Sequence, residues 1–147
     1  MDENQVMTPF QYAELCRTIK GCPDELRKQY LFFGLVSELG EVATLLKKRL
    51  CDHTSVDHNE IVSELGDIAY YIASMFDPAS FAELLSFPIE PVSVRKAMQV
   101  LLETHDPAYW RALCVALEVA PHEAIEASIA KLLRLKETDA QYGGDQS

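Results

Sequence analysis

The sequence predicts an all-α fold, and three observations lead to that prediction. Apolar residues recur at helical spacing along nearly the whole chain, whereas alternating stretches rich in β-branched residues are scarce. Prolines and polar capping residues stand where helices would begin. The chain has 147 residues, 48% of them hydrophobic, which is enough for a buried core without disulfides or a structural metal. We therefore expect one helical domain over residues 1–147.

The first expected helix spans about 9–20. Thr8 followed by Pro9 is typical of an N-cap and a first-turn proline, and Gln11 completes a capping box with Thr8. Gly21 suits the end of this helix, because glycine adopts the left-handed conformation that often terminates helices.

The second and third helices are expected at about 24–50 and 58–76. The second has apolar residues at helical spacing and ends in a basic run that includes Lys48, where cations complement the helix dipole. The third is introduced by Asp57 with Glu60 three residues later, which predicts another capping box.

The segment 77–108 contains four prolines around one expected helix at about 92–104, and we interpret it as an insertion. Two further helices are expected at about 107–118 and 121–136, each with proline in its first turn. A flexible tail is expected from about residue 139.

The charge balance excludes some classes of partner. The chain has 13 Lys and Arg against 23 Asp and Glu, a formal net charge of −10, which disfavours nucleic-acid polymers and anionic membranes. No 18-residue apolar run and no signal peptide is recognisable, so we expect a cytoplasmic protein. Its four cysteines form no C-x-x-C pair and are expected to be reduced thiols.

An octapeptide repeats within the second and third expected helices. The segment 36–43 reads V-S-E-L-G-E-V-A, and 62–69 reads V-S-E-L-G-D-I-A, so the copies agree at six of eight positions. Glycine stands between the acids of each copy, at Gly40 and Gly66, where it costs about 1 kcal/mol of helix stability relative to alanine. A close approach by a neighbouring helix or a ligand would offset that cost.

Each copy also places two carboxylates three residues apart, on one helix face. A helical hairpin would bring Glu38 and Glu41 opposite Glu64 and Asp67. Four like charges within about 5 Å repel one another strongly, so a divalent cation is their natural partner. Oxygen ligands favour Mg²⁺, with Mn²⁺ as an alternative.

The repeated acids have two alternative interpretations. A single pair at this spacing is usually a solvated helix face, but two copies in matching apolar contexts favour a metal site. A di-iron carboxylate site would need Glu-x-x-His on its helices, and neither copy provides that motif.

At these residues the chain resembles the MazG-like nucleoside triphosphate pyrophosphohydrolases, an all-α family marked by E-x-x-E, a spacer and E-x-x-D. The four acids match that motif. The resemblance extends over most of the chain to Tyr12, Thr18, Gly34, Leu35, Lys47, Lys48, Lys131, Leu132 and Arg134.

The resemblance implies a helical bundle of the all-α NTP pyrophosphatase type, completed by oligomerisation into a homodimer or homotetramer. It also implies that the four acids bind Mg²⁺ and that activated water attacks the α-phosphorus of a nucleoside triphosphate, giving the monophosphate and pyrophosphate. Carboxylates, metal and cations are sufficient for such phosphoryl chemistry.

Roles for individual residues follow as expectations. Glu38 or Glu41 would accept the proton of the attacking water, and the sequence leaves the choice between them open. Candidates for contact with the triphosphate are Lys48, Lys131 and Arg134, with solvated cations near helix ends as the alternative.

Aromatic residues and one serine complete the candidates. Tyr71 lies one turn after Asp67 and would contact the sugar or pack in the core. Trp110 and Phe87 would stack a base or, for Trp110 especially, pack in the core. Ser128 stands where the family often has asparagine, which alters a polar contact to the nucleotide.

An alternative of a different class stays open at this point. The chain would then be a non-catalytic nucleotide-binding or helical interaction module, with its site remodelled by the segment 77–108. Release of pyrophosphate would separate the two possibilities.

Overall fold

The computed structural model describes residues 7–19, 21–51 and 55–143, with only the backbone for 139–143. This part of the chain forms seven α-helices and one short 3₁₀ turn and contains no strand, so the all-α prediction is confirmed. The elements are α1 (Pro9–Arg17), η1 (Asp24–Leu26), α2 (Arg27–Cys51), α3 (His58–Ser74), α4 (Pro78–Ser86), α5 (Val94–Thr104), α6 (Pro107–Ala116) and α7 (Pro121–Gly143).

Two of the expected N-caps are present. The Thr8 hydroxyl accepts a hydrogen bond from the Gln11 backbone N–H at 3.1 Å, and the Gln11 side chain accepts from the Thr8 N–H at 3.0 Å, so this capping box is confirmed. The Asp57 carboxylate accepts from the Asn59 N–H at 3.0 Å and caps α3 through that bond, whereas the expected capping box with Glu60 does not form among the described residues. α1 ends at Arg17, before the expected residue 20.

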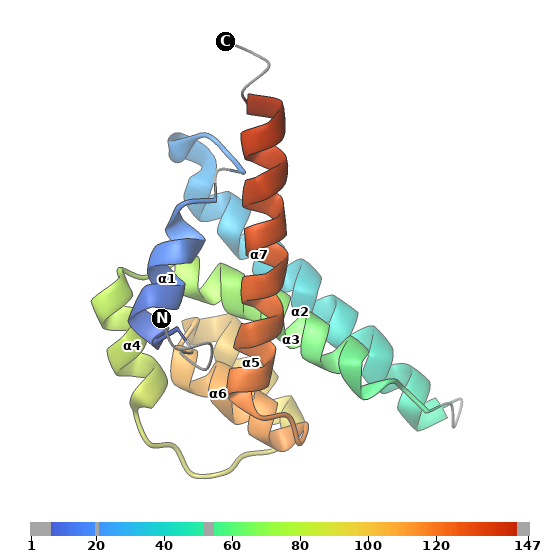
Figure 1. Cartoon of the computed structure of the whole chain (residues 1–147). Coiled ribbons are helices and arrows are strands. Elements are labelled where there is room, and N and C mark those ends of the chain that lie inside the picture. Colours follow the sequence, from blue (N-terminus) through green and yellow to red (C-terminus); the bar gives the residue numbers. More distant parts are fainter. Residues whose placement is uncertain (1–6, 20, 52–54, 144–147) are drawn as a thin grey trace.

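α2 and α3 form the helical hairpin that the repeat predicted (Figure 1). α7 lies across α3, and it continues to Gly143, beyond the expected end at 136 and past residue 139. The site is therefore built where three helices meet: α2 and α3 side by side, with α7 packed on α3.

Residues within 77–108 form two helices rather than the one expected. Asp77 caps α4 by accepting from the Ser80 N–H at 3.0 Å. α4 packs on α1 and α6, and its Phe81 is buried in the same core as Leu101 of α5. Arg111 donates hydrogen bonds to two carbonyl oxygens at the end of α4. Both helices thus belong to the common core.

The two glycines of the repeat differ in their surroundings. A Cβ atom on Gly66 would lie 2.7 Å from the carbonyl oxygen of Ala124, so α7 approaches α3 as closely as glycine permits. A Cβ atom on Gly40 would have no atom within 4 Å among the described residues, so no neighbouring helix makes the expected close approach there. Within the described residues, packing against another helix requires glycine in the second copy and not in the first.

All four cysteines are free. In the described portion of the chain, we find no helix with the length and apolarity that crossing a membrane would require.

Candidate metal centre

Three of the four repeated acids gather at one point. Glu38 comes from α2, and Glu64 and Asp67 come from α3; each offers a carboxylate oxygen, and these oxygens all lie within 4.8 Å of one another. The hairpin brings the two helices together, and the three-residue spacing places both α3 acids on the face toward α2. We call Glu38, Glu64 and Asp67 the acidic cluster.

Glu41 lies outside the acidic cluster. It is one helical turn beyond Glu38 on α2, and its side chain is exposed. The prediction that four acids converge is therefore correct for three of them. The face of α2 that packs on α3 includes Glu38, whereas Glu41 faces solvent.

Glu38 shows the electrostatic consequence of clustering. The pKa of its carboxyl rises from 4.5 to about 8. Burial is the largest cause, since removal from water disfavours the charged form, and the hydrogen bond with Glu64 comes next. The charges of Asp67, Glu64 and Glu41 add to the rise in pKa. Without a bound cation, the acidic cluster favours a proton on Glu38 at neutral pH.

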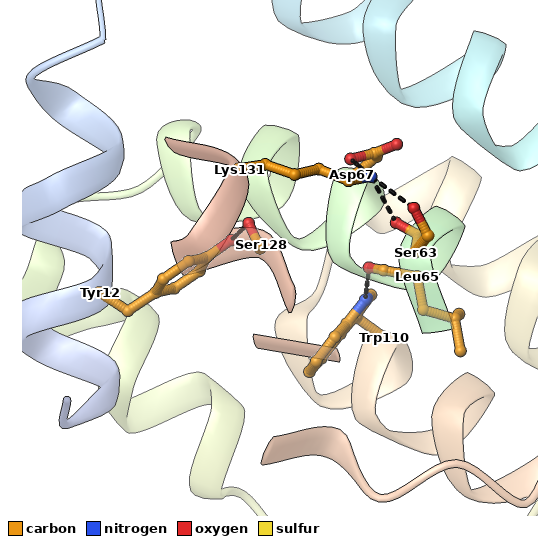
Figure 2. A network of polar contacts seen from close by, with 7 residues as sticks. All are labelled: Tyr12, Ser63, Leu65, Asp67, Trp110, Ser128 and Lys131. Carbon is orange, nitrogen blue, oxygen red and sulfur yellow. Dashed lines mark hydrogen bonds and ion pairs between the residues drawn. The ribbon is translucent and has the colours of Figure 1, made fainter. Parts of the chain in front are cut away.

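Lys131 is the cation that the structure places at the acidic cluster (Figure 2). Its Nζ lies 2.8 Å from Asp67 Oδ1 and donates to Ser63 Oγ at 2.5 Å. Asp67 and Lys131 are both partly exposed, with side-chain exposures of 30% and 34%. Of the three cations expected to face a triphosphate, Lys131 is the one joined to the acids.

A cavity of about 270 Å³ opens beside these charged groups. Its charged residues are Glu38, Asp67 and Lys131, so acids and a cation share one part of its wall. The remaining lining residues are Ile19, Tyr30, Tyr70, Tyr71, Ser128, Leu132 and Leu135. The cavity thus combines a charged wall with an aromatic and aliphatic one, as small-molecule sites commonly do.

Tyr71 both faces the cavity and packs against neighbouring aromatic rings. It lines the cavity, and its ring packs edge-on to Tyr30 and Tyr70, with centroids 6.2 and 5.1 Å away. A Cβ atom on Gly34 would lie 2.1 Å from this ring, so glycine makes room for it. Burial is the largest cause of the raised pKa of the Tyr71 hydroxyl, and the charge of Glu38 contributes.

Ser128 ties α7 to α1 at the back of the cavity. Its hydroxyl is hydrogen-bonded to the hydroxyl of Tyr12 at 2.7 Å, and both side chains are buried (Figure 2). Ser128 also lines the cavity. It therefore both bonds to Tyr12 and faces the cavity.

Two of the expected cations lie away from the cavity. Lys48 is exposed in the last turn of α2, ten residues and roughly 15 Å along the helix axis from Glu38. Arg134 is exposed on α7, and neither residue is among those that line the cavity. Lys131 differs because its position on α7 directs it toward α3.

The two aromatic candidates for base stacking also lie elsewhere. Trp110 is 1% exposed and donates from Nε1 to the Leu65 carbonyl oxygen at 2.9 Å, which confirms the core alternative. Phe87 is 62% exposed at the end of α4, and it does not line the cavity either.

Sequence reasoning missed three residues of the site. Ser63 binds Lys131, and Tyr30 and Tyr70 line the cavity. A signal existed for Ser63, because it belongs to the repeated V-S-E-L-G segment directly before Glu64. For the tyrosines the sequence offered only apolar helical spacing, which core residues share.

The donor set suits a hard divalent cation. Three carboxylates supply only oxygen ligands, which Mg²⁺ and Mn²⁺ prefer, and the single lysine leaves their summed charge negative. Burial is the largest cause of the raised pKa of Glu38, and the neighbouring negative charges add to it. An added cation would offset those negative charges.

No family model, curated protein or solved structure matches the chain.

Proposed function

We propose that this chain is a Mg²⁺-dependent nucleoside triphosphate pyrophosphohydrolase that yields a nucleoside monophosphate and pyrophosphate. The observation that carries the proposal is the acidic cluster, whose three carboxylates come from two copies of one motif and meet beside a cavity. The resemblance of that motif to the MazG-like family supplies the reaction, since geometry by itself points only to a cation and an anionic ligand.

Glu38, Glu64 and Asp67 would hold the cation, with Mn²⁺ able to replace Mg²⁺. The bound ion would neutralise charge on the phosphoryl group and lower the pKa of water. The cavity volume of about 270 Å³ and its aromatic wall support a nucleoside as the remaining part of the ligand.

Glu41 is the residue that we assign as general base. Its carboxylate is exposed one turn from Glu38, and it is not tied into the acidic cluster. An unshared carboxylate oxygen is free to accept the proton of the attacking water, as a general base requires. Glu38, by contrast, is engaged with Glu64.

Exposed apolar side chains support the further proposal of a homodimer or homotetramer. On α2, Phe33, Val36 and Leu50 are 65%, 42% and 77% exposed. Side chains of this size on one helix are suited to an interface with another copy. Sedimentation of the purified protein would measure its mass.

The proposal is tested by incubating the purified protein with a panel of normal and modified nucleoside triphosphates and Mg²⁺. Products are separated by ion-exchange chromatography. We expect monophosphate and pyrophosphate in equal amounts. Release of orthophosphate with diphosphate, or no turnover of any nucleotide, would contradict the proposal.

Two matched pairs sharpen this test. Glu64→Gln should abolish turnover, while Glu60→Gln, an exposed acid one turn earlier on α3, should leave it unchanged. Glu41→Gln should retain Mn²⁺ binding and lose turnover, whereas Glu38→Gln should lose both. Turnover retained in Glu41→Gln would contradict its assignment as the base.

A further inference from the structure

Lys131 differs from the other described lysines and arginines in forming an ion pair. Among the residues that the structure describes, it is the only lysine or arginine whose side chain forms an ion pair with a carboxylate. Its Nζ also donates to Ser63 Oγ, so two side chains of α3 hold one ammonium group (Figure 2). A solvated lysine at a helix surface would have neither partner.

The packing of α7 contributes to the position of Lys131. The close contact of Gly66 with Ala124 fixes how near α7 lies to α3. One turn before Lys131, the Ser128 hydroxyl is bound to Tyr12, which ties the same face of α7 to α1. As a result, the ammonium group of Lys131 lies within hydrogen-bond distance of Asp67.

The ion pair between Lys131 and Asp67 disfavours binding of a metal ion at the acidic cluster. The ammonium group of Lys131 binds Asp67 Oδ1, and a metal ion held by the acidic cluster needs oxygens of Asp67 as well. An incoming divalent ion must displace Lys131 or bind beside a positive charge, and either change weakens its affinity.

We propose that Lys131 is a built-in counter-ion that competes with the metal for Asp67, so that the metal binds together with the triphosphate and not before it. The proposal rests on the proposed function and adds an order of binding to it.

A triphosphate would reverse the competition. Its phosphate oxygens offer Lys131 another anionic partner, which frees Asp67 for the metal, and they bind the metal as well. Because coupling between two ligands is reciprocal, triphosphate should raise the affinity for metal, and metal should raise the affinity for triphosphate.

The first experiment measures binding of Mn²⁺ alone by isothermal titration calorimetry. Lys131→Gln should bind Mn²⁺ at least about fivefold more tightly than the wild-type protein. Lys136→Gln removes the same charge from an exposed position of α7 and should change the affinity by less than about twofold, because solvent screens that charge.

A second pair keeps every charge and so tests the geometry. Ser63→Ala removes one partner of Lys131 and should tighten Mn²⁺ binding by less than Lys131→Gln does. Ser37→Ala alters the corresponding, exposed position of the first repeat and should have no effect. This pair also serves if Lys131→Gln does not fold.

The third measurement uses inorganic triphosphate, which has no base, as the probe in thermal unfolding. For the wild-type protein, Mn²⁺ and triphosphate together should raise the melting temperature by more than the sum of their separate effects. In Lys131→Gln this excess should shrink.

Equal Mn²⁺ affinity in the wild-type protein and Lys131→Gln, including no measurable binding in either, would overturn the proposal. That result is separate from failure of the proposed function, which would appear as absent pyrophosphate release. The comparison of Mn²⁺ binding needs no substrate and no turnover.

Discussion

Gly66 and Ala124 are in contact across α3 and α7: a Cβ atom on the glycine would lie only 2.7 Å from the carbonyl oxygen of the alanine. Because that oxygen belongs to helix backbone, it could not move aside without shifting α7. At this point of close packing, α3 and α7, the helices that carry Asp67 and Lys131, come together.

The two glycines of the repeat should respond in opposite ways to alanine. Gly66→Ala should lower the free energy of unfolding by about 1–3 kcal/mol, because the methyl group overlaps Ala124. Gly40→Ala should raise it by about 0.5–1 kcal/mol, because the space is open and alanine favours the helix. Urea denaturation measures both, and a stabilised Gly66→Ala variant would show that α7 is not in close contact with α3.

The buried pair of Tyr12 and Ser128 should behave as a coupled unit. Tyr12→Phe or Ser128→Ala alone leaves one buried hydroxyl without its partner, at a cost of about 1–3 kcal/mol. The double variant should lose less stability than the two single losses added together. A double-mutant cycle in urea measures the difference, and strict additivity would mean that the two hydroxyls do not interact.

Glu38 should make the metal-free protein less stable as pH rises. Its folded-state pKa, about 8, exceeds the ordinary value of 4.5, so between these values the folded state holds a proton that the unfolded state has released. The contribution of Glu38 to the free energy of unfolding is therefore fully present below pH 4.5 and is lost by about pH 8. Solvent screening limits the loss to the order of 1 kcal/mol.

Urea denaturation in EDTA at several pH values checks this dependence. Glu38→Gln should remove part of the fall in stability between pH 4.5 and about pH 8. These limits are the ordinary pKa of the carboxyl and its pKa in the folded protein. Glu41→Gln, in the exposed half of the same motif, should keep most of it. Identical pH profiles for Glu38→Gln and the wild-type protein would contradict the raised pKa.

Glu64 should separate the metal site from a solvated helix face. In EDTA, Glu64→Gln should be as stable as the wild-type protein or more stable by about 1 kcal/mol, because one like charge is removed. With excess Mg²⁺, the rise in its melting temperature should be smaller than in the wild-type protein. Glu60→Gln is the control, and equal rises in Glu64→Gln and the wild-type protein would exclude Glu64 as a ligand.

Local signals explain why most helices were predicted. Capping by Thr8 and Asp57 involves residues within three positions of each cap, so sequence shows where α1 and α3 begin. Asp77 and Pro78 provide the same signal for α4 as Thr8 and Pro9 provide for α1, but the four prolines of 77–108 favoured an insertion with a single helix.

The sequence by itself determined an all-α chain and a repeat that brings Glu38 toward Glu64 and Asp67, because spacing along a helix decides which residues share a face. Only the tertiary structure decided that Glu41 faces solvent and that Lys131 meets Asp67, a residue 64 positions away along the chain. Those outcomes depend on which face of α2 packs on α3 and on how closely α7 packs on α3. Both are set by contacts between helices, which helical periodicity does not encode.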